Sequence, residues 1–209
     1  GKIRELFKKV IKDCTVDFFT IKDDVGHKTY VRAATMLFLK SVYDLFGAEA
    51  AQSSYVEFSI GRGIYISTYE HVLAGAEQAE KLKSRMRQLA AEKVLFKKHT
   101  YPLEDAMELF KARGMADKAK LFRYRMSSMV NIYEMEGYYD YYYGYMLPNA
   151  GYVKWFDVIP YKNGFMLLLP FRENPMEVGE FTERRKLFQT MERASEWGRI
   201  AGIETVGDL

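Results

Sequence analysis

A dense run of tyrosines in the middle of the sequence limits what the chain can fold into. Seven tyrosines fall within residues 137–152, in the stretch GYYDYYYGYMLPNAGY, here called the tyrosine run. Tyrosine combines an apolar ring with a hydroxyl group, so it suits surfaces that are partly dry and partly polar. Two interpretations stay open at this point. The run forms either a pair of strands with alternate rings packed inside, or the lining of a ligand cleft.

The composition is that of one large folded domain, or of one domain with an appendage. The chain has 209 residues, 48% of them hydrophobic, which is enough to bury a sizeable core. The net charge of +3 permits an anionic ligand without indicating nucleic acid. The one cysteine, Cys14, excludes an internal disulfide and favours a reducing compartment. Because no apolar run has the length of a membrane helix or the form of a secretion signal, we expect a soluble cytoplasmic protein.

Hydrophobic periodicity and turn residues predict a mixture of helices and strands. A strand-like stretch at 15–21 and a loop at 23–30 precede a helix that starts near Tyr30 and stops at Gly47. Further helices are expected at about 77–92, 102–114, 116–126 and 182–201. Strands are expected at 53–60, 63–68, 95–101, 130–135, in the tyrosine run, and at 152–159 and 164–171. Short turns between the later strands favour antiparallel pairing, so the expected fold class is α+β.

Several of these segments resemble the second additional domain of threonyl-tRNA synthetases, a domain that also occurs in alanyl-tRNA editing proteins. The matching pieces cover about residues 30 to 160 and read VRAATMLFLKSVYDLFG, FSIGRGIYI, KKHTYPLEDAMELFKARGMADKAKLF and VNIYEMEGYYDYYYGYMLPNAGYVKWFDV. The opening GKIRELFKKVIKDCTVDFF is similar to the end of a TGS domain, a small β-grasp module. The resemblance implies a TGS-like remnant or linker at 1–28. It implies a synthetase-like module, an antiparallel sheet with packed helices, at 29–209.

A bacterial family called uridine kinase-like is a nearer resemblance. The tyrosine run, the stretch GFMLLLPFRENP and the ending EWGRIAGIETVGDL are similar to that family. Its members combine a TGS module, a synthetase-like domain and a P-loop kinase domain, and this chain stops where the kinase domain would begin. The resemblance therefore implies a C-terminal kinase partner that uses ATP and magnesium, and no cofactor for this chain.

The editing site of the synthetase-type domain has a metal-binding pattern that this sequence lacks. The family's site uses His-x3-His on the first helix and Cys-x3-His on a later segment. The matching positions here are Arg32, Met36, Tyr142 and Met146. Arginine has no lone pair for a metal, and tyrosine and methionine are poor zinc ligands. The other candidate ligands are scattered without metal-site spacing: Cys14, His27, His71 and His99. We therefore expect no bound metal.

The remaining hypothesis is a cleft that has the shape of the editing site but different side chains and no metal. The Arg32 guanidinium would bind a phosphate or carboxylate through two hydrogen bonds, or else stack on Tyr142 and fill the space of the metal. Both interpretations stay open. The predicted cleft residues are Arg32, Met36, Arg62, Tyr138, Tyr142, Tyr145, Met146 and Lys154. The acidic residues that flank the run are expected to be solvated, namely Glu134, Glu136 and Asp140.

Three functional hypotheses follow, and none includes a catalytic residue with a known motif. The sequence contains no P-loop and no nucleophile elbow. The first hypothesis is a noncatalytic binding or regulatory module for a small anionic or nucleotide-like ligand, attached to a kinase domain. The second is a metal-free hydrolase of aminoacyl esters. The third is a remnant that binds tRNA or other RNA, a partner that the mixed charges around residues 111–125 disfavour. No membrane partner is expected.

Overall fold

The computed structural model describes residues 1–68, 72 and 74–203. His71, one of the candidate ligands, and residues 204–209 of the predicted lead-in to a kinase lie outside the described residues. The helices are α1 (Asp24–Phe46), α2 (Ala48–Gln52), α3 (Ala76–Ala91), α4 (Leu103–Ala112), α5 (Ala116–Phe122), η1 (Ala150–Tyr152) and α6 (Arg185–Ile200). The strands are β1 (Tyr55–Ile60), β2 (Gly63–Ser67), β3 (Lys97–Pro102), β4 (Met129–Met135), β5 (Tyr138–Asp140), β6 (Asp157–Tyr161) and β7 (Gly164–Leu168).

The strands form two antiparallel sheets, which confirms the α+β class. One sheet has the order β1-β2-β7-β6 and the other the order β3-β4-β5. The turn between β4 and β5 consists of Glu136 and Gly137, and both have positive φ angles, 45° and 82°. Such a two-residue turn matches the twist of the paired strands, so it fixes their register.

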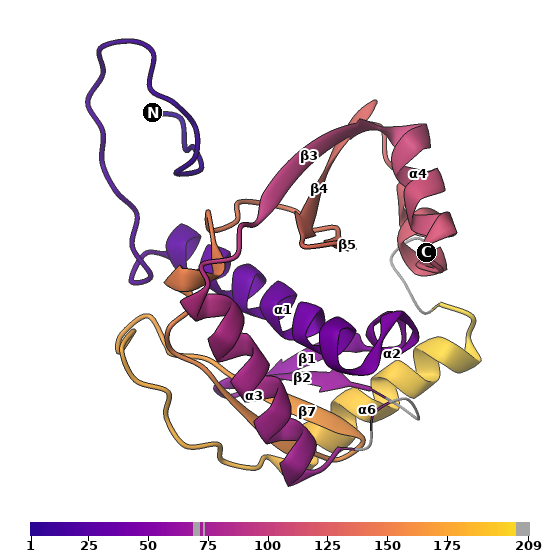
Figure 1. Cartoon of the computed structure of the whole chain (residues 1–209). Coiled ribbons are helices and arrows are strands. Elements are labelled where there is room, and N and C mark those ends of the chain that lie inside the picture. The colour runs from indigo at the N-terminus through magenta and orange to yellow at the C-terminus, as the bar shows by residue number, and fades with distance from the viewer. Residues whose placement is uncertain (69–71, 73, 204–209) are drawn as a thin grey trace.

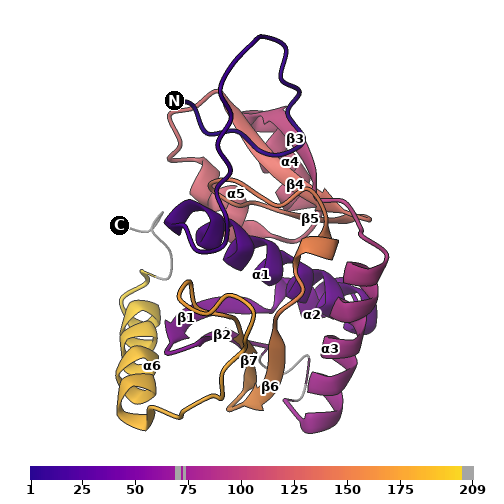
Figure 2. The same cartoon turned by 90° about the vertical axis from the view of Figure 1, so that its left-hand side faces the viewer.

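Helix α1 runs through the middle of the molecule, between the two sheets. Figures 1 and 2 show β3, β4 and β5 with α4 on one side of α1 and the four-stranded sheet on the other. Met36, Leu37, Phe38 and Leu39 are consecutive, so they point in directions all around the helix, and their exposed surface is 0%, 0%, 0% and 4%. A helix that is apolar on all sides is a buried helix. The middle of α1 is therefore buried on every side, between the two sheets.

The four-stranded sheet is covered on both faces. Along β2, Ile64 and Ile66 belong to the main core, whereas Tyr65 points to the other face and packs against Phe188 of α6, with ring centroids 5.1 Å apart. Alternate side chains of a strand point to opposite faces of its sheet. Helix α6 therefore closes the face that α1 and α3 leave uncovered (Figure 2).

The N-terminal part differs from the sequence-based expectation. The predicted strand at 15–21 is wrong, because these residues form neither helix nor strand, and the predicted loop at 23–30 is wrong, because α1 begins at Asp24. The Asp23 carboxylate accepts a hydrogen bond from the backbone N–H of Thr20, 2.7 Å away, just before the helix. Gly26 lies within the helix, where a Cβ would stand 1.9 Å from the carbonyl oxygen of Thr20. The glycine thus permits a close approach of two chain segments instead of marking a loop.

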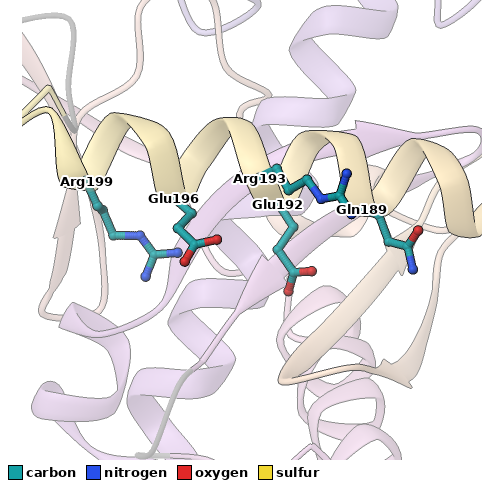
Figure 3. Close-up of a pocket in the computed structure, with 5 residues that line it drawn as sticks. All are labelled: Gln189, Glu192, Arg193, Glu196 and Arg199. Carbon is teal, nitrogen blue, oxygen red and sulfur yellow. The ribbon is translucent and has the colours of Figure 1, made fainter.

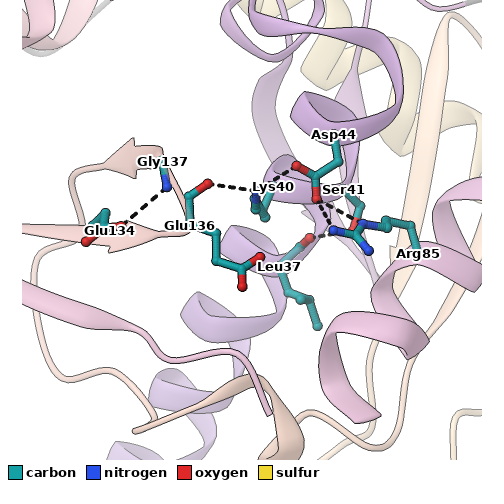
Figure 4. A network of polar contacts seen from close by, with 8 residues as sticks. All are labelled: Leu37, Lys40, Ser41, Asp44, Arg85, Glu134, Glu136 and Gly137. Atoms are coloured by element: carbon teal, nitrogen blue, oxygen red, sulfur yellow. Dashed lines mark hydrogen bonds and ion pairs between the residues drawn. The ribbon is translucent and has the colours of Figure 1, made fainter. Parts of the chain in front are cut away.

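A buried polar network ties α1 to the tip of the second sheet (Figure 4). Lys40 is 3% exposed, and its Nζ donates to Asp44 Oδ1 at 2.6 Å and to the carbonyl oxygen of Glu136 at 3.0 Å. Arg85 of α3 donates to the other oxygen of Asp44, Oδ2, at 2.9 and 2.8 Å. The network therefore joins α1, α3 and the β4–β5 turn, and it fixes the strand that leads into the tyrosine run.

Candidate anion-binding site

Helix α1 and the tyrosine run meet at Arg32. The Arg32 Nε donates a hydrogen bond to the carbonyl oxygen of Tyr145 at 2.9 Å, and Nη2 donates to Thr29 Oγ1 at 3.2 Å. The guanidinium lies against Gly144, where a Cβ would stand 2.8 Å from Arg32 Cζ. Because two of its N–H groups are used inside the protein, Arg32 holds the tyrosine run in place and adds positive charge beside it.

The carboxylate of Glu5 lies at this junction, although it comes from the N-terminal segment. Its Oε1 is 2.7 Å from the Tyr133 hydroxyl and accepts from the backbone N–H of Met146 at 3.3 Å. Its Oε2 accepts from Lys98 Nζ at 2.9 Å. Glu5 is 7% exposed and Tyr133 is fully buried. Strands β3 and β4 and the tyrosine run thus supply three donors, which form hydrogen bonds with both oxygens of one carboxylate.

The charges at the junction favour an anion. Burial lowers the pKa of Arg32, while Tyr133 and Glu5 act in the opposite direction and help to keep the guanidinium charged. Burial raises the pKa of Tyr133 well above its usual value of 10, and the hydrogen bond to Glu5 raises it further. Tyr133 is therefore a neutral hydroxyl that donates its hydrogen, which can serve Glu5 or the carbonyl oxygen of Gly144, 3.0 Å away.

The other positions that match the metal quartet belong to the core. Met36 is 0% and Met146 is 2% exposed, and both lie in the main hydrophobic cluster. The Tyr142 hydroxyl is buried without a well-formed hydrogen bond. Burial raises the pKa of Tyr142 well above its usual value, and the charge of Asp140 raises it further. No group of three or more His, Cys, Asp or Glu side chains with metal-site geometry occurs among the described residues.

Asp140, at the end of β5, is not solvated as the sequence analysis expects. It is 3% exposed and forms an ion pair with Lys118 of α5. The hydroxyl of Tyr138 donates to Asp140 Oδ2 at 3.2 Å, and the Tyr138 ring packs against Tyr43 of α1 at 5.7 Å between centroids. A buried charge needs such partners to offset its desolvation. Tyr138 and Asp140 therefore anchor the tyrosine run to α1 and α5.

Two of the predicted cleft residues share no hydrogen bond, ion pair or ring contact with Arg32 in the described part of the chain. Arg62, in the β1–β2 turn, stacks on Phe171 at 4.7 Å from the ring centroid and lies against Gly179. Lys154 is exposed, between η1 and β6. The structure therefore brings together Arg32, Tyr145 and Met146. Met36, Tyr138 and Tyr142 belong to or pack against the main hydrophobic cluster.

A separate hollow lies along α6 (Figure 3). Its lining side chains all project from that helix: Gln189, Glu192, Arg193, Glu196 and Arg199. Because a single helix supplies the whole lining, the hollow is a surface feature and not a site built between elements. None of the predicted cleft residues takes part in it. Among the described residues, no helix is long and apolar enough to cross a membrane.

Comparisons with known proteins find similarity to threonine–tRNA ligases. The chain is 24% identical over 159 residues to a threonine–tRNA ligase of Clostridium kluyveri, which is 74% of this chain and 24% of the ligase. It is 25% identical over 167 residues to the enzyme of Symbiobacterium thermophilum, with 76% and 24% covered. The chain contains a threonyl-tRNA synthetase-like domain. It spans about a quarter of the length of these relatives. No protein-family profile matches the chain.

Three residues of this site are missed by the sequence analysis: Glu5, Lys98 and Tyr133. The sequence around Tyr133 gives a weak sign of a special role, because the other buried side chains of β4 are apolar, namely Val130, Ile132 and Met135. Lys98 looks like its neighbour Lys97, which is exposed. Nothing in the sequence marks Glu5 as a site residue, because it lies 93 positions before Lys98 and 128 positions before Tyr133.

Proposed function

We propose that this chain is a noncatalytic module that binds a small anion at the donors around Lys98, Tyr133 and the Met146 N–H. The observation that carries the proposal is the Glu5 carboxylate, which accepts from all three at 2.9, 2.7 and 3.3 Å. A group of donors that holds a protein carboxylate has the geometry to hold the carboxylate of a ligand. Two of the four positions that match the metal ligands of an editing domain lie beside Glu5, namely Arg32 and Met146.

The wider setting of the module is part of the same proposal. The resemblance to uridine kinase-like proteins suggests a TGS-like remnant before the domain and a P-loop kinase domain after it. In such a protein the kinase domain would bind ATP and magnesium, and the anion site would sense a ligand or position a substrate for it. A cytoplasmic location belongs to this setting. We expect no phosphoryl transfer to any nucleoside by this chain alone, measured with labelled ATP.

A ligand screen tests the module directly. A ligand that binds only the folded protein raises the unfolding temperature by mass action. Nucleosides, nucleotides, amino acids and tRNA fragments are compared on the wild type, on Lys98→Gln and on Lys97→Gln. The two lysines are neighbours on β3, but Lys97 pairs with Glu134 at 3.7 Å and is 52% exposed, so it is a matched control. We expect an anionic ligand whose shift is lost in Lys98→Gln and kept in Lys97→Gln.

Two results would replace this proposal. Hydrolysis of an aminoacyl ester that is lost in Arg32→Ala would favour the metal-free hydrolase. The pair His99–Glu134, with Nε2 and Oε2 3.1 Å apart, is the acid–base candidate in that case. A shift given only by tRNA fragments, unchanged in Lys98→Gln, would favour the RNA-binding remnant. No shift in the wild type or in Glu5→Ala, with any compound, would exclude an anion site.

A further inference from the structure

The N-terminal segment is attached to the rest of the molecule mainly through one side chain. Among residues 1–20, which form neither helix nor strand, Glu5 is the only buried residue. The apolar side chains around it are exposed, with Leu6 at 59%, Phe7 at 41% and Val10 at 65%. The segment is therefore not docked by hydrophobic burial. Its position depends on the recognition of one carboxylate.

Such an attachment is weak for its length. Each ordered residue loses conformational freedom, and a single set of charge-assisted hydrogen bonds must offset that loss. Figures 1 and 2 show the segment as an extended loop that stands off the body of the protein, beside β3 and β4. An anchor of this kind can be displaced by a free ligand that satisfies the same donors.

The geometry of the donors selects the chemical class of that ligand. Two donors meet one oxygen of Glu5 and the third meets the other oxygen. Lys98 and Arg32 supply positive charge, and the Tyr133 hydroxyl and the Met146 N–H are neutral donors. An ester or an amide lacks both the charge and the second strong acceptor oxygen. A carboxylate has both, as Glu5 demonstrates.

We propose that Glu5 is an internal ligand that occupies a carboxylate-binding site, and that a small free carboxylic acid displaces it and releases residues 1–20. This inference rests on the proposed function and names its ligand class and its regulation. The N-terminal segment then reports on the site, because it is bound when the site is free of ligand and released when a carboxylate enters. No covalent step is involved.

Chemical rescue tests the proposal. Glu5→Ala keeps Cβ and removes the γ-methylene and the carboxylate, so it frees the donors for a small free carboxylate such as propionate. We expect Glu5→Ala to unfold at a lower temperature than the wild type, and sodium propionate to raise that temperature by several degrees. Propionamide, which has the same shape without the charge, and sodium chloride at equal ionic strength should not. Asp13→Ala, which removes an acidic side chain from an exposed part of the same segment and keeps Glu5, is the matched control and should respond to propionate only as weakly as the wild type.

Competition gives a second readout. In the wild type, Glu5 fills the site in most molecules, and the apparent affinity for propionate is reduced in proportion to the fraction in which the site is open. The wild type should therefore bind propionate at least about tenfold more weakly than Glu5→Ala. In the wild type, saturating propionate should speed tryptic cleavage after Arg4, because the Arg4–Glu5 bond is protected only while Glu5 is bound. If Glu5→Ala does not fold, Glu5→Gln and this cleavage assay decide the question.

The outcomes separate the two proposals. Equal propionate binding by the wild type and Glu5→Ala would overturn the internal-ligand proposal and leave the anion site standing. No propionate effect on Glu5→Ala, Glu5→Gln or the cleavage rate would overturn it as well. If the ligand screen then also gives no shift with any compound, the proposed function fails with it.

Discussion

The guanidinium of Arg32 lies against the backbone of Gly144, in the middle of the tyrosine run. A Cβ at Gly144 would stand 2.8 Å from Arg32 Cζ, and the residue has a φ angle of 126°. Glycine is therefore required for two reasons: it adopts this backbone conformation without strain, and it leaves space for the Arg32 side chain of α1. This contact fixes the course of the chain into Tyr145 and Met146, whose backbone groups bind Arg32 and Glu5.

Gly144→Ala should lower the free energy of unfolding by about 2–3 kcal/mol, because it adds backbone strain and a clash with Arg32. Gly137→Ala is the matched control. It also has a positive φ, 82°, but nothing lies within 4 Å of its Cβ position, so strain alone should cost it about 1 kcal/mol. Urea unfolding measures both. Equal losses in the two variants would show that the Arg32 contact carries no weight.

Lys40→Met should destabilise the fold more than Lys28→Met, although both lysines pair with an aspartate four residues away on α1. The Lys40 side chain is 4% exposed and its partner Asp44 16%, whereas Lys28 and Asp24 are 64% and 57% exposed. Removal of Lys40 leaves the Glu136 carbonyl without this donor, at a cost of about 1–3 kcal/mol. The exposed pair contributes less than about 1 kcal/mol. Unfolding in urea compares the two, and similar losses would contradict a structural role for the network in Figure 4.

The elements with local signals were predictable, and those with tertiary causes were not. The helix stop at Gly47 and the hairpin turns follow from residues within a few positions of each other. The sequence predicts the start of α1 too late, because Gly26 is typical of a loop, whereas its close approach to Thr20 is visible only in the folded structure. The tyrosine run was expected to be largely strand, but only Tyr138–Asp140 pairs with β4, and the rest is held by side-chain contacts.

The candidate site was half predictable for the same reason. The meeting of α1 with the tyrosine run came from the resemblance, and Arg32 and Met146 are found there. The Gly61-Arg62-Gly63 turn predicts a second arginine near the cleft. The structure turns that hairpin toward Phe171 instead. Glu5 could not be assigned, because no periodicity or motif links a solvated N-terminal segment to a donor far along the chain.

Asp140→Asn should be strongly destabilising, with a loss of about 2–4 kcal/mol. The change leaves Lys118, whose side chain is 23% exposed, without its ion-pair partner. Removal of one member of a largely buried ion pair is costly because the charge of the other member is then uncompensated. Glu134→Gln is the control. Its side chain is 12% exposed, but its partners Lys97 and His99 are 52% and 38% exposed and stay hydrated, so about 1 kcal/mol or less is expected. Thermal and urea unfolding report the difference, and an unchanged stability of Asp140→Asn would disprove the anchoring role.

Tyr30 should make the fold sensitive to alkali. Its hydroxyl donates to the carbonyl oxygen of Trp155 at 2.7 Å and accepts from the Trp155 N–H at 2.9 Å, and it is 5% exposed. Burial raises the pKa of Tyr30 to about 12, and the hydrogen bond to Trp155 only partly offsets this effect. The unfolded chain has a pKa of about 10 at this residue. The neutral hydroxyl is therefore favoured more in the folded state than in the unfolded state.

The sign of the pH dependence follows. Below pH 10 the contribution of Tyr30 is present in full, and it is lost as the pH rises from about 10 to about 12, to a total of about 2–3 kcal/mol. Tyr30→Phe lacks this titration, so its stability relative to the wild type should improve across that window, although it starts lower because two hydrogen bonds are gone. Tyr143→Phe, at a site 80% exposed, is the control and should follow the wild type. Chemical unfolding at several pH values measures the difference, and parallel wild-type and Tyr30→Phe curves from pH 10 to 12 would contradict the assignment.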